Sequence, residues 1–182
     1  MLIGITGHKF SGKSTVTDIL SRSMGYEVRS FATKLKAMVM ALTGCSLDDL
    51  ENYDFKENEI VPEHLWVFCS NEKHNYRSLL QGLGDYMRDK NPEIFIESEL
   101  YNNPKKCIIS DCRMLNEAEA IKKRGGVIVR VIRDDAGNND THKSEVEIDM
   151  IEPDYLVYNN GTIDDLHKSL DTLTQLWKVF DV

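Results

Sequence analysis

The sequence has no paired cysteine motif and no long hydrophobic run. Its four cysteines, Cys45, Cys69, Cys107 and Cys112, form no C-x-x-C pair, and no histidine stands at zinc-ligand spacing from them. This argues against a zinc site or a redox role, and Cys107 in an expected buried strand is better interpreted as a small hydrophobe. The longest apolar runs, such as residues 37–42, are far too short to span a bilayer.

An excess of positive charge is also missing, because the formal net charge is −8. Nucleic-acid backbones and anionic membranes both favour surplus Lys and Arg, so neither is expected as the main partner. Hydrophobic residues make up 41% and charged residues 29%, as in an ordinary soluble protein. A site for an anionic ligand must therefore be a local basic patch on an acidic body.

Strands alternate with helices along the chain, which predicts an α/β fold. A parallel sheet of about five strands, with helices on both faces, is expected. The expected strands cover residues 2–6, 26–32, 106–110, 127–132 and 155–158. No repeat or linker marks a second domain, so residues 1–182 are predicted to be one domain. A closing helix shows an apolar stripe at Ile163, Leu166, Leu170, Leu173, Leu176 and Phe180.

The strongest motif is Gly7-His8-Lys9-Phe10-Ser11-Gly12-Lys13-Ser14, which matches G-x-x-x-x-G-K-[ST] at every fixed position. It lies between an expected strand and an expected helix over residues 15–24. A strand that turns through glycines into a helix directs backbone N–H groups and the positive end of the helix dipole at one spot. Lys13 is placed to reach the β- and γ-phosphates of a nucleotide, and the Ser14 hydroxyl to ligate Mg²⁺.

Residues 76–88 predict a helix with two neighbouring stripes. Tyr76, Leu79, Leu80, Leu83 and Met87 make the apolar stripe. Arg77, Gln81, Gly84 and Arg88 make the second. Arginine suits phosphate oxygens, glutamine can pair with a base edge, and glycine lets a flat ring come close. The alternative is a solvated face with Arg77 and Asp85 in a surface ion pair, and spacing alone does not decide.

Asp111 stands at the tip of the third expected strand, where an acid can hold Mg²⁺ through water. Asp111 could equally cap the helix expected around residues 115–124. The tip of this strand is expected to lie next to the glycine-rich loop. Arg113 is expected in the same crevice as Asp111.

Residues 133–145 are polar and flanked by cations, which suits a lid that closes over phosphates. Ser144 and Glu147 also fit a capping box, so they could simply start a short helix. His142 alone is a weak metal or base candidate. Residues 45–75 show only a weak pattern, interpreted as an irregular or short-helical excursion.

With these pieces in place, the chain resembles a P-loop kinase of the adenylate kinase-like group. More narrowly, it resembles the deoxynucleoside monophosphate kinases of tailed bacteriophages. The likeness is carried by five segments. They are residues 7–15, Ser30-Phe31-Ala32 with Leu35-Lys36, Tyr76-Arg77-Ser78-Leu79-Leu80-Gln81 with Gly84 and Arg88, Ile109-Ser110-Asp111-Cys112-Arg113 with Asn116-Glu117, and His142-Lys143-Ser144-Glu145. Asn160-Gly161-Thr162 is shared with dephospho-coenzyme A kinases.

The resemblance implies a role for each matching residue. ATP-binding residues would be Gly7, His8, Lys9, Ser11, Gly12, Lys13, Ser14, Thr15, Asn160 and Gly161. Acceptor-binding residues would be Phe31, Lys34, Arg77, Gln81, Gly84, Arg88 and Asp111. An acceptor-binding excursion over about residues 33–100 would contain all of them except Phe31 and Asp111. Lys13, Arg113 and Arg133 would act in catalysis, and Ser14 and Asp111 would hold Mg²⁺.

The expected reaction moves the γ-phosphoryl of ATP to a (deoxy)nucleoside 5′-monophosphate, with Mg²⁺ as cofactor. Arg77, Arg88, Arg113, Arg130 and Arg133 would surround the anions. One alternative is a hydroxyl acceptor, as in dephospho-coenzyme A kinase, with Asp111 as base. Another is a regulatory NTP-binding switch. A cytoplasmic location is expected (the host cytoplasm if the protein is viral), because the sequence starts directly in a strand without a leader. The expected oligomeric state is a monomer or a homodimer.

Overall fold

The computed structural model describes residues 1–136 and 147–180. The chain divides into two compact units. The first is formed by Met1–Ser30 with Leu100–Val182, and the second by Phe31–Glu99. The second unit covers almost the same residues as the excursion expected over about residues 33–100.

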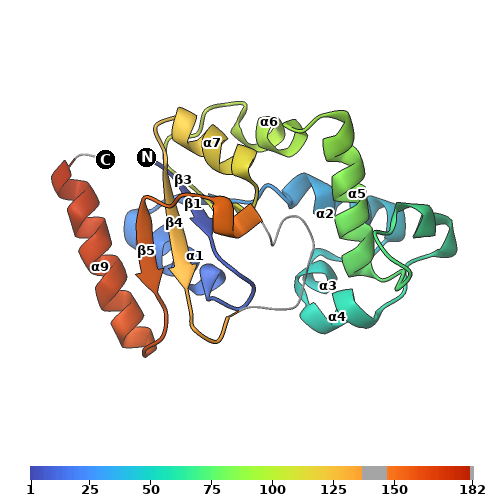
Figure 1. Cartoon of the computed structure of the whole chain (residues 1–182), viewed down its shortest axis with the longest axis horizontal. Helices are drawn as coiled ribbons and strands as arrows, with labels where there is room; N and C mark the ends of the chain where they lie inside the picture. Colours follow the sequence, from blue (N-terminus) through green and yellow to red (C-terminus); the bar gives the residue numbers. More distant parts are fainter. Residues whose placement is uncertain (137–146, 181–182) are drawn as a thin grey trace. The chain divides into compact units, whose positions relative to one another are not determined.

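The first unit is built on a five-stranded parallel sheet in the order β2-β3-β1-β4-β5. Figure 1 labels β3, β1, β4 and β5. The strands are β1 (Leu2–Thr6), β2 (Glu27–Arg29), β3 (Cys107–Ile109), β4 (Val127–Ile132) and β5 (Tyr155–Tyr158). The predicted parallel sheet of five strands is thereby confirmed. β2 is shorter than the expected residues 26–32.

Helices cover both faces of this sheet. Ile3 and Ile5 of β1 pack in one core with residues of α1 (Lys13–Met24) and α9 (Ile163–Phe180). On the other face, a Cβ on Gly4 would meet Ile121 of α7 (Leu115–Lys123), so α7 packs closely there. Alternate residues of one buried strand therefore serve two helical layers, as in doubly covered parallel sheets.

The α9 stripe differs from the prediction at its end. Leu166 and Leu170 are buried and Leu173 is partly buried, as expected. In the following turn Trp177, 1% exposed, is the buried residue, while Leu176 is 42% exposed. The indole ring lies edge-on to Tyr155 of β5, with 5.5 Å between ring centroids. Aromatic packing against the outer strand therefore decides which side of the last turns is buried.

The second unit is helical. It contains α2 (Thr33–Thr43), α3 (Leu47–Glu51), α4 (Tyr53–Asn58), the 3₁₀ turn η1 (Glu63–Phe68), α5 (Tyr76–Lys90) and most of α6 (Ile94–Leu100). Residues 45–75 are thus short helices joined by turns, as interpreted from their weak pattern. In α2, Ala32 is the N-cap and Thr33 is already helical. α6 was not predicted from the sequence.

The second short helical turn, η2 (Glu147–Met150), belongs to the first unit. Within the described residues, no helix combines the length and the apolar composition needed to cross a membrane.

Candidate functional site

The glycine-rich loop joins β1 to α1, and two of its positions require glycine. Gly7 has φ 141°, and a Cβ there would lie 2.5 Å from the Val131 carbonyl oxygen. Gly12 is the left-handed N-cap of α1, with φ 97°. Both positions are in the region that only glycine adopts without strain, so the loop geometry follows from the spacing of the motif.

Lys13 turns back over the loop. Its Nζ donates to the carbonyl oxygens of Gly7, at 2.6 Å, and of His8, at 2.7 Å. The ammonium group therefore lies against the loop backbone at the N-terminus of α1. Cation and helix dipole act on the same spot, which is the arrangement that favours a phosphate group.

Asn159 contacts the glycine-rich loop, and this contact was not predicted from the sequence. It follows β5, and its Nδ2 donates to the Ser11 carbonyl oxygen at 2.9 Å. Asn160, the neighbour predicted near the adenine, accepts a hydrogen bond from the Asp134 amide at 2.9 Å. The turn over residues 159–162 is a sequence signal, but only the sheet order places it beside the loop.

The Asp111 carboxylate accepts a hydrogen bond from the Ser30 hydroxyl at 2.7 Å. The alternative that Asp111 caps the next helix is wrong. Met114 is the N-cap of α7, and Glu117 accepts hydrogen bonds from the amides of Arg113 and Met114 at 2.8 and 3.1 Å. Asp111 is therefore not used to start a helix.

Arg130 does not belong with the expected phosphate-binding arginines. Its guanidinium donates to the carbonyl oxygens of Ile148, at 2.6 Å, and of Ile151. It thus stabilises the η2 turn. Arg133, by contrast, is exposed just after β4. The rest of the expected lid from residue 137, including His142 and Ser144, lies outside the described residues.

His8 of the loop also contacts η2, because its Nε2 lies 2.9 Å from Asp149 Oδ1. Glu147, which was considered for a capping box with Ser144, accepts a hydrogen bond from the Leu115 amide at 3.0 Å. This turn is therefore connected to the phosphate loop and to the start of α7.

In the second unit, α5 carries the predicted acceptor face. Arg77 Nε donates to Glu57 Oε1 at 2.7 Å, whereas the alternative considered for it was a surface pair with Asp85. Gln81 Oε1 accepts from the Ser70 hydroxyl at 3.3 Å, and the Arg88 guanidinium lies 4.9 Å from the centre of the Phe95 ring. Arg77, Gln81 and Arg88 are all partly exposed on one unit.

Gly84 is buried on the same helix, and its missing Cβ leaves room for the protein itself. A Cβ there would lie 3.0 Å from Arg88 Nη1 and 3.2 Å from Leu35 Cδ2. Phe31 is only 1% exposed and packs in the core. Lys34 Nζ lies 3.9 Å from the nearly buried Glu99 carboxylate. Gly84 was expected to admit a flat ligand ring, but the Arg88 and Leu35 side chains already occupy the space beside it.

Comparison with known proteins decides the family. A sequence model of the family described as deoxynucleotide monophosphate kinase matches residues 46–170, more than half of the chain. The chain belongs to the deoxynucleotide monophosphate kinase family. The resemblance drawn from the sequence motifs is thereby confirmed, and the protein is a kinase whose substrates are nucleotides.

Two viral relatives are similar to this kinase. A protein of Acanthamoeba polyphaga mimivirus, assigned by name to the deoxynucleotide monophosphate kinases, is 31% identical over 188 residues, covering 93% of this chain and 94% of its own. The deoxynucleotide monophosphate kinase of Escherichia phage RB69 is 23% identical over 66 residues, which are 36% of this chain and 27% of that protein.

Among solved structures, the dephospho-CoA kinase from Campylobacter jejuni aligns with a TM-score of 0.50 and 15% identity, over 100% of this chain and 98% of that one. At this identity the likeness shows the fold alone, and the fold is that of a P-loop kinase.

Membership of a kinase family implies that a divalent cation binds together with the nucleotide. Ser14 lies in the first turn of α1, and Asp111 offers a carboxylate, so both predicted ligands are oxygen donors. Mg²⁺ prefers such ligands and commonly binds through one or two side chains, substrate phosphates and water. Within the described part of the chain, no cluster of three or more His, Cys, Asp or Glu side chains is placed to hold a metal.

Cys112, directly after Asp111, is fully buried in this kinase. Burial raises the pKa of its thiol well above the ordinary value, and the charges of Glu117 and Asp111 raise it further. A thiol held neutral is a poor nucleophile and a poor metal ligand. For Cys112, burial is therefore a physical reason against a redox or metal role.

Proposed function

We propose that this kinase transfers the γ-phosphoryl group of ATP, bound with Mg²⁺ on the phosphate loop, to the phosphate of a deoxynucleoside 5′-monophosphate bound on the polar face of α5. Transfer requires the two phosphates to meet in line. The products are ADP and the deoxynucleoside diphosphate.

The donor half of the proposal has its main support in Lys13. Its Nζ lies 2.6 Å and 2.7 Å from two loop carbonyl oxygens, at the positive end of α1. From there it would exchange these acceptors for phosphate oxygens. Ser14 would hold Mg²⁺ in the first turn, Gly7, His8, Lys9, Ser11, Gly12 and Thr15 would surround the phosphates, and Asn160 with Gly161 would lie near the adenine.

The acceptor half is supported by the composition of the α5 face. Arg77 and Arg88 would neutralise the acceptor phosphate, and Gln81 would contact the base. Gly84 would keep α5 close to α2, and Phe31 and Lys34 would support this face from the start of α2. The remaining charged residues proposed to act on the phosphates are Asp111 through Mg²⁺, and Arg113 and Arg133 on the transferred group.

The chemistry needs no general base. A phosphate monoester loses its second proton near pH ~6, so the attacking oxygen is already ionised at neutral pH. The protein's task is to hold two anions together and to neutralise their charge, which Lys13, Mg²⁺ and arginines can do. The chain as a whole has a net charge of −8, so the lysine and arginines proposed to bind the phosphates are a local concentration of positive charge.

The test is a coupled assay of ADP release with ATP, Mg²⁺ and a panel of the common monophosphates. Release that depends on dGMP, dTMP or another deoxynucleoside monophosphate supports the proposal. Release only with dephospho-coenzyme A would indicate a hydroxyl acceptor instead. Slow hydrolysis that no monophosphate accelerates would indicate a regulatory switch.

A further inference from the structure

Arg77 is anchored at one end of its guanidinium group. Its Nε donates to Glu57 Oε1 at 2.7 Å, and both side chains are 23% exposed. The guanidinium carbon lies 5.8 Å from the centre of the Tyr53 ring, on the same short helix as Glu57. A carboxylate and an aromatic face thus restrict both the direction and the plane of the guanidinium.

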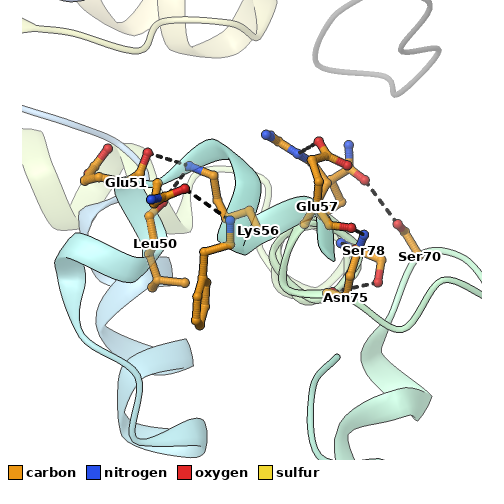
Figure 2. Close-up of polar contacts among 11 residues, drawn as sticks. Leu50, Glu51, Lys56, Glu57, Ser70, Asn75 and Ser78 are labelled. Atoms are coloured by element: carbon orange, nitrogen blue, oxygen red, sulfur yellow. Dashed lines mark hydrogen bonds and ion pairs between the residues drawn. The ribbon is translucent and has the colours of Figure 1, made fainter. Parts of the chain in front are cut away.

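The helices that carry this pair are tied together beneath it (Figure 2). The Asn75 side chain, 2% exposed, donates to the Glu57 carbonyl oxygen at 2.7 Å. It also caps α5 by accepting from the Ser78 amide at 2.9 Å. The end of α4 and the start of α5 are therefore held in one register, so the carboxylate meets Arg77 from a fixed position.

The contact with Glu57 uses Nε of Arg77, which leaves Nη1 and Nη2 for a phosphate. Nε is one of five N–H donors, and Nη1 and Nη2 form the outer edge of the fork. Within the described residues, the Arg77 guanidinium donates its hydrogen bond to Glu57, and it does so through Nε. Phosphate oxygens bind such forks in a bidentate way.

We propose that Glu57 is a positioning residue that orients Arg77 toward the phosphate of the acceptor monophosphate. The inference rests on the proposed function, in which Arg77 contacts that phosphate. A free arginine loses rotamer freedom when it binds a ligand, and a side chain already held by a neighbour loses less. Glu57 therefore increases affinity without touching the substrate.

The test compares Michaelis constants of variants that fold, as judged by circular dichroism and melting temperature. Glu57→Ala is expected to raise KM for the monophosphate about tenfold, with kcat within about twofold and KM for ATP unchanged. Glu57→Ser, too short to reach Nε, should do the same. In Glu57→Gln the amide oxygen still accepts from Nε, so KM should return to within about threefold of wild type.

Glu51→Gln is the matched control. Glu51 also carries an ion pair in the second unit, with 2.5 Å between Lys36 Nζ and Glu51 Oε1, and it lies in a separate group of contacts (Figure 2). Its neutralisation should leave both Michaelis constants unchanged. A similar rise in KM for Glu51→Gln would mean that charge in this unit, and not the position of Arg77, matters, and would overturn the inference.

A double-mutant cycle separates the inference from the function on which it rests. With Arg77→Ala in place, adding Glu57→Ala should raise KM for the monophosphate no further. If Arg77→Ala weakens the monophosphate but Glu57→Ala only lowers the melting temperature, the inference alone fails. If Arg77→Ala itself leaves KM unchanged, the acceptor face and the inference both fail.

Discussion

At the scale of single residues, Lys13 is the side chain on which the proposed phosphoryl transfer depends most. It is a cation whose Nζ donates to two carbonyl oxygens of the loop at the N-terminus of α1. In the proposed function, phosphate oxygens replace these two acceptors, whereas the fold of the loop depends on the glycines. Function and stability are therefore expected to separate at this position.

Lys13→Ala is expected to lower kcat at least about a hundredfold, because one preorganised charge on the transferred group is lost. Circular dichroism should show an unchanged fold. The matched control is Lys123→Ala, which removes a cation from an exposed pair with Glu119 on α7. A near-normal rate for Lys13→Ala would remove the phosphate-loop assignment.

The Cys112 thiol should make stability depend on pH. Because burial raises its pKa in the folded state, the native protein keeps a proton that the unfolded chain loses above about pH 8.5. The stabilisation is present below that pH and declines as the pH rises toward the raised pKa. The difference in unfolding free energy between wild type and Cys112→Ala should shrink from pH 8 to pH 10 in urea titrations. A constant difference over this range would contradict the shift.

At the scale of elements, the glycines differ in what they make possible. Gly12 and Gly25 both have left-handed backbone, at the two ends of α1. A Cβ on Gly25 meets nothing within 4 Å, whereas one on Gly12 would overlap the Asn159 side chain that holds the loop. The same substitution therefore tests backbone strain alone at one end and the loop at the other.

Gly25→Ala should cost about 1–2 kcal/mol of unfolding free energy from left-handed strain and leave kcat unchanged. Gly12→Ala should cost more and also raise KM for ATP, because Asn159 must move away from the Ser11 carbonyl oxygen. Urea unfolding and the coupled assay measure the two effects. Equal behaviour of the two variants would show that the Asn159 contact has no role in the loop.

Two glycines in α5 make a second comparison. A Cβ on Gly82 would overlap the Phe68 carbonyl oxygen and approach the Ser70 amide nitrogen to 2.7 Å, both of them backbone atoms. At Gly84 the neighbours are the ends of flexible side chains, Arg88 and Leu35, at 3.0 and 3.2 Å. Backbone yields less than a side chain end.

Gly82→Ala should therefore destabilise the protein more than Gly84→Ala, although both gain about 1 kcal/mol of helix propensity. Melting temperatures of the two variants measure the order. If Gly84→Ala were the less stable, the packing of residues 68–70 against α5 would be looser than described.

At the scale of the whole molecule, the proposed substrates belong to different units of the chain. The phosphate loop lies in the unit of Met1–Ser30 with Leu100–Val182, and the α5 face lies in Phe31–Glu99. Each ligand should therefore depend on residues of its own unit. Oligomeric state and a cytoplasmic location stay predictions.

Each substrate at a hundredfold excess over its Kd should raise the melting temperature by roughly 5–10 °C. Lys13→Ala should reduce the shift caused by ATP and keep that caused by the monophosphate, and Arg77→Ala should do the reverse. Differential scanning fluorimetry measures both. Loss of both shifts in either variant would mean that the two sites are not separable in this way.

The phosphate loop, the parallel sheet and the α5 stripe were predictable from the sequence, because each depends on local spacing. A glycine motif between a strand and a helix has one common fold, and alternating strands and helices produce a covered parallel sheet. The same locality explains why Tyr76, Leu79 and Leu83 are buried as expected.

Only the tertiary structure decided which partner each polar side chain takes. Arg77 pairs with Glu57 across 20 residues, Asn159 reaches Ser11 across 148, and Arg130 holds η2. Hydrogen bonds are directional and short, so two groups can pair only when the folded backbone brings them within about 3 Å. Spacing along one helix therefore predicted the face on which Arg77 lies, but the choice between Asp85 and Glu57 depended on where α4 packs.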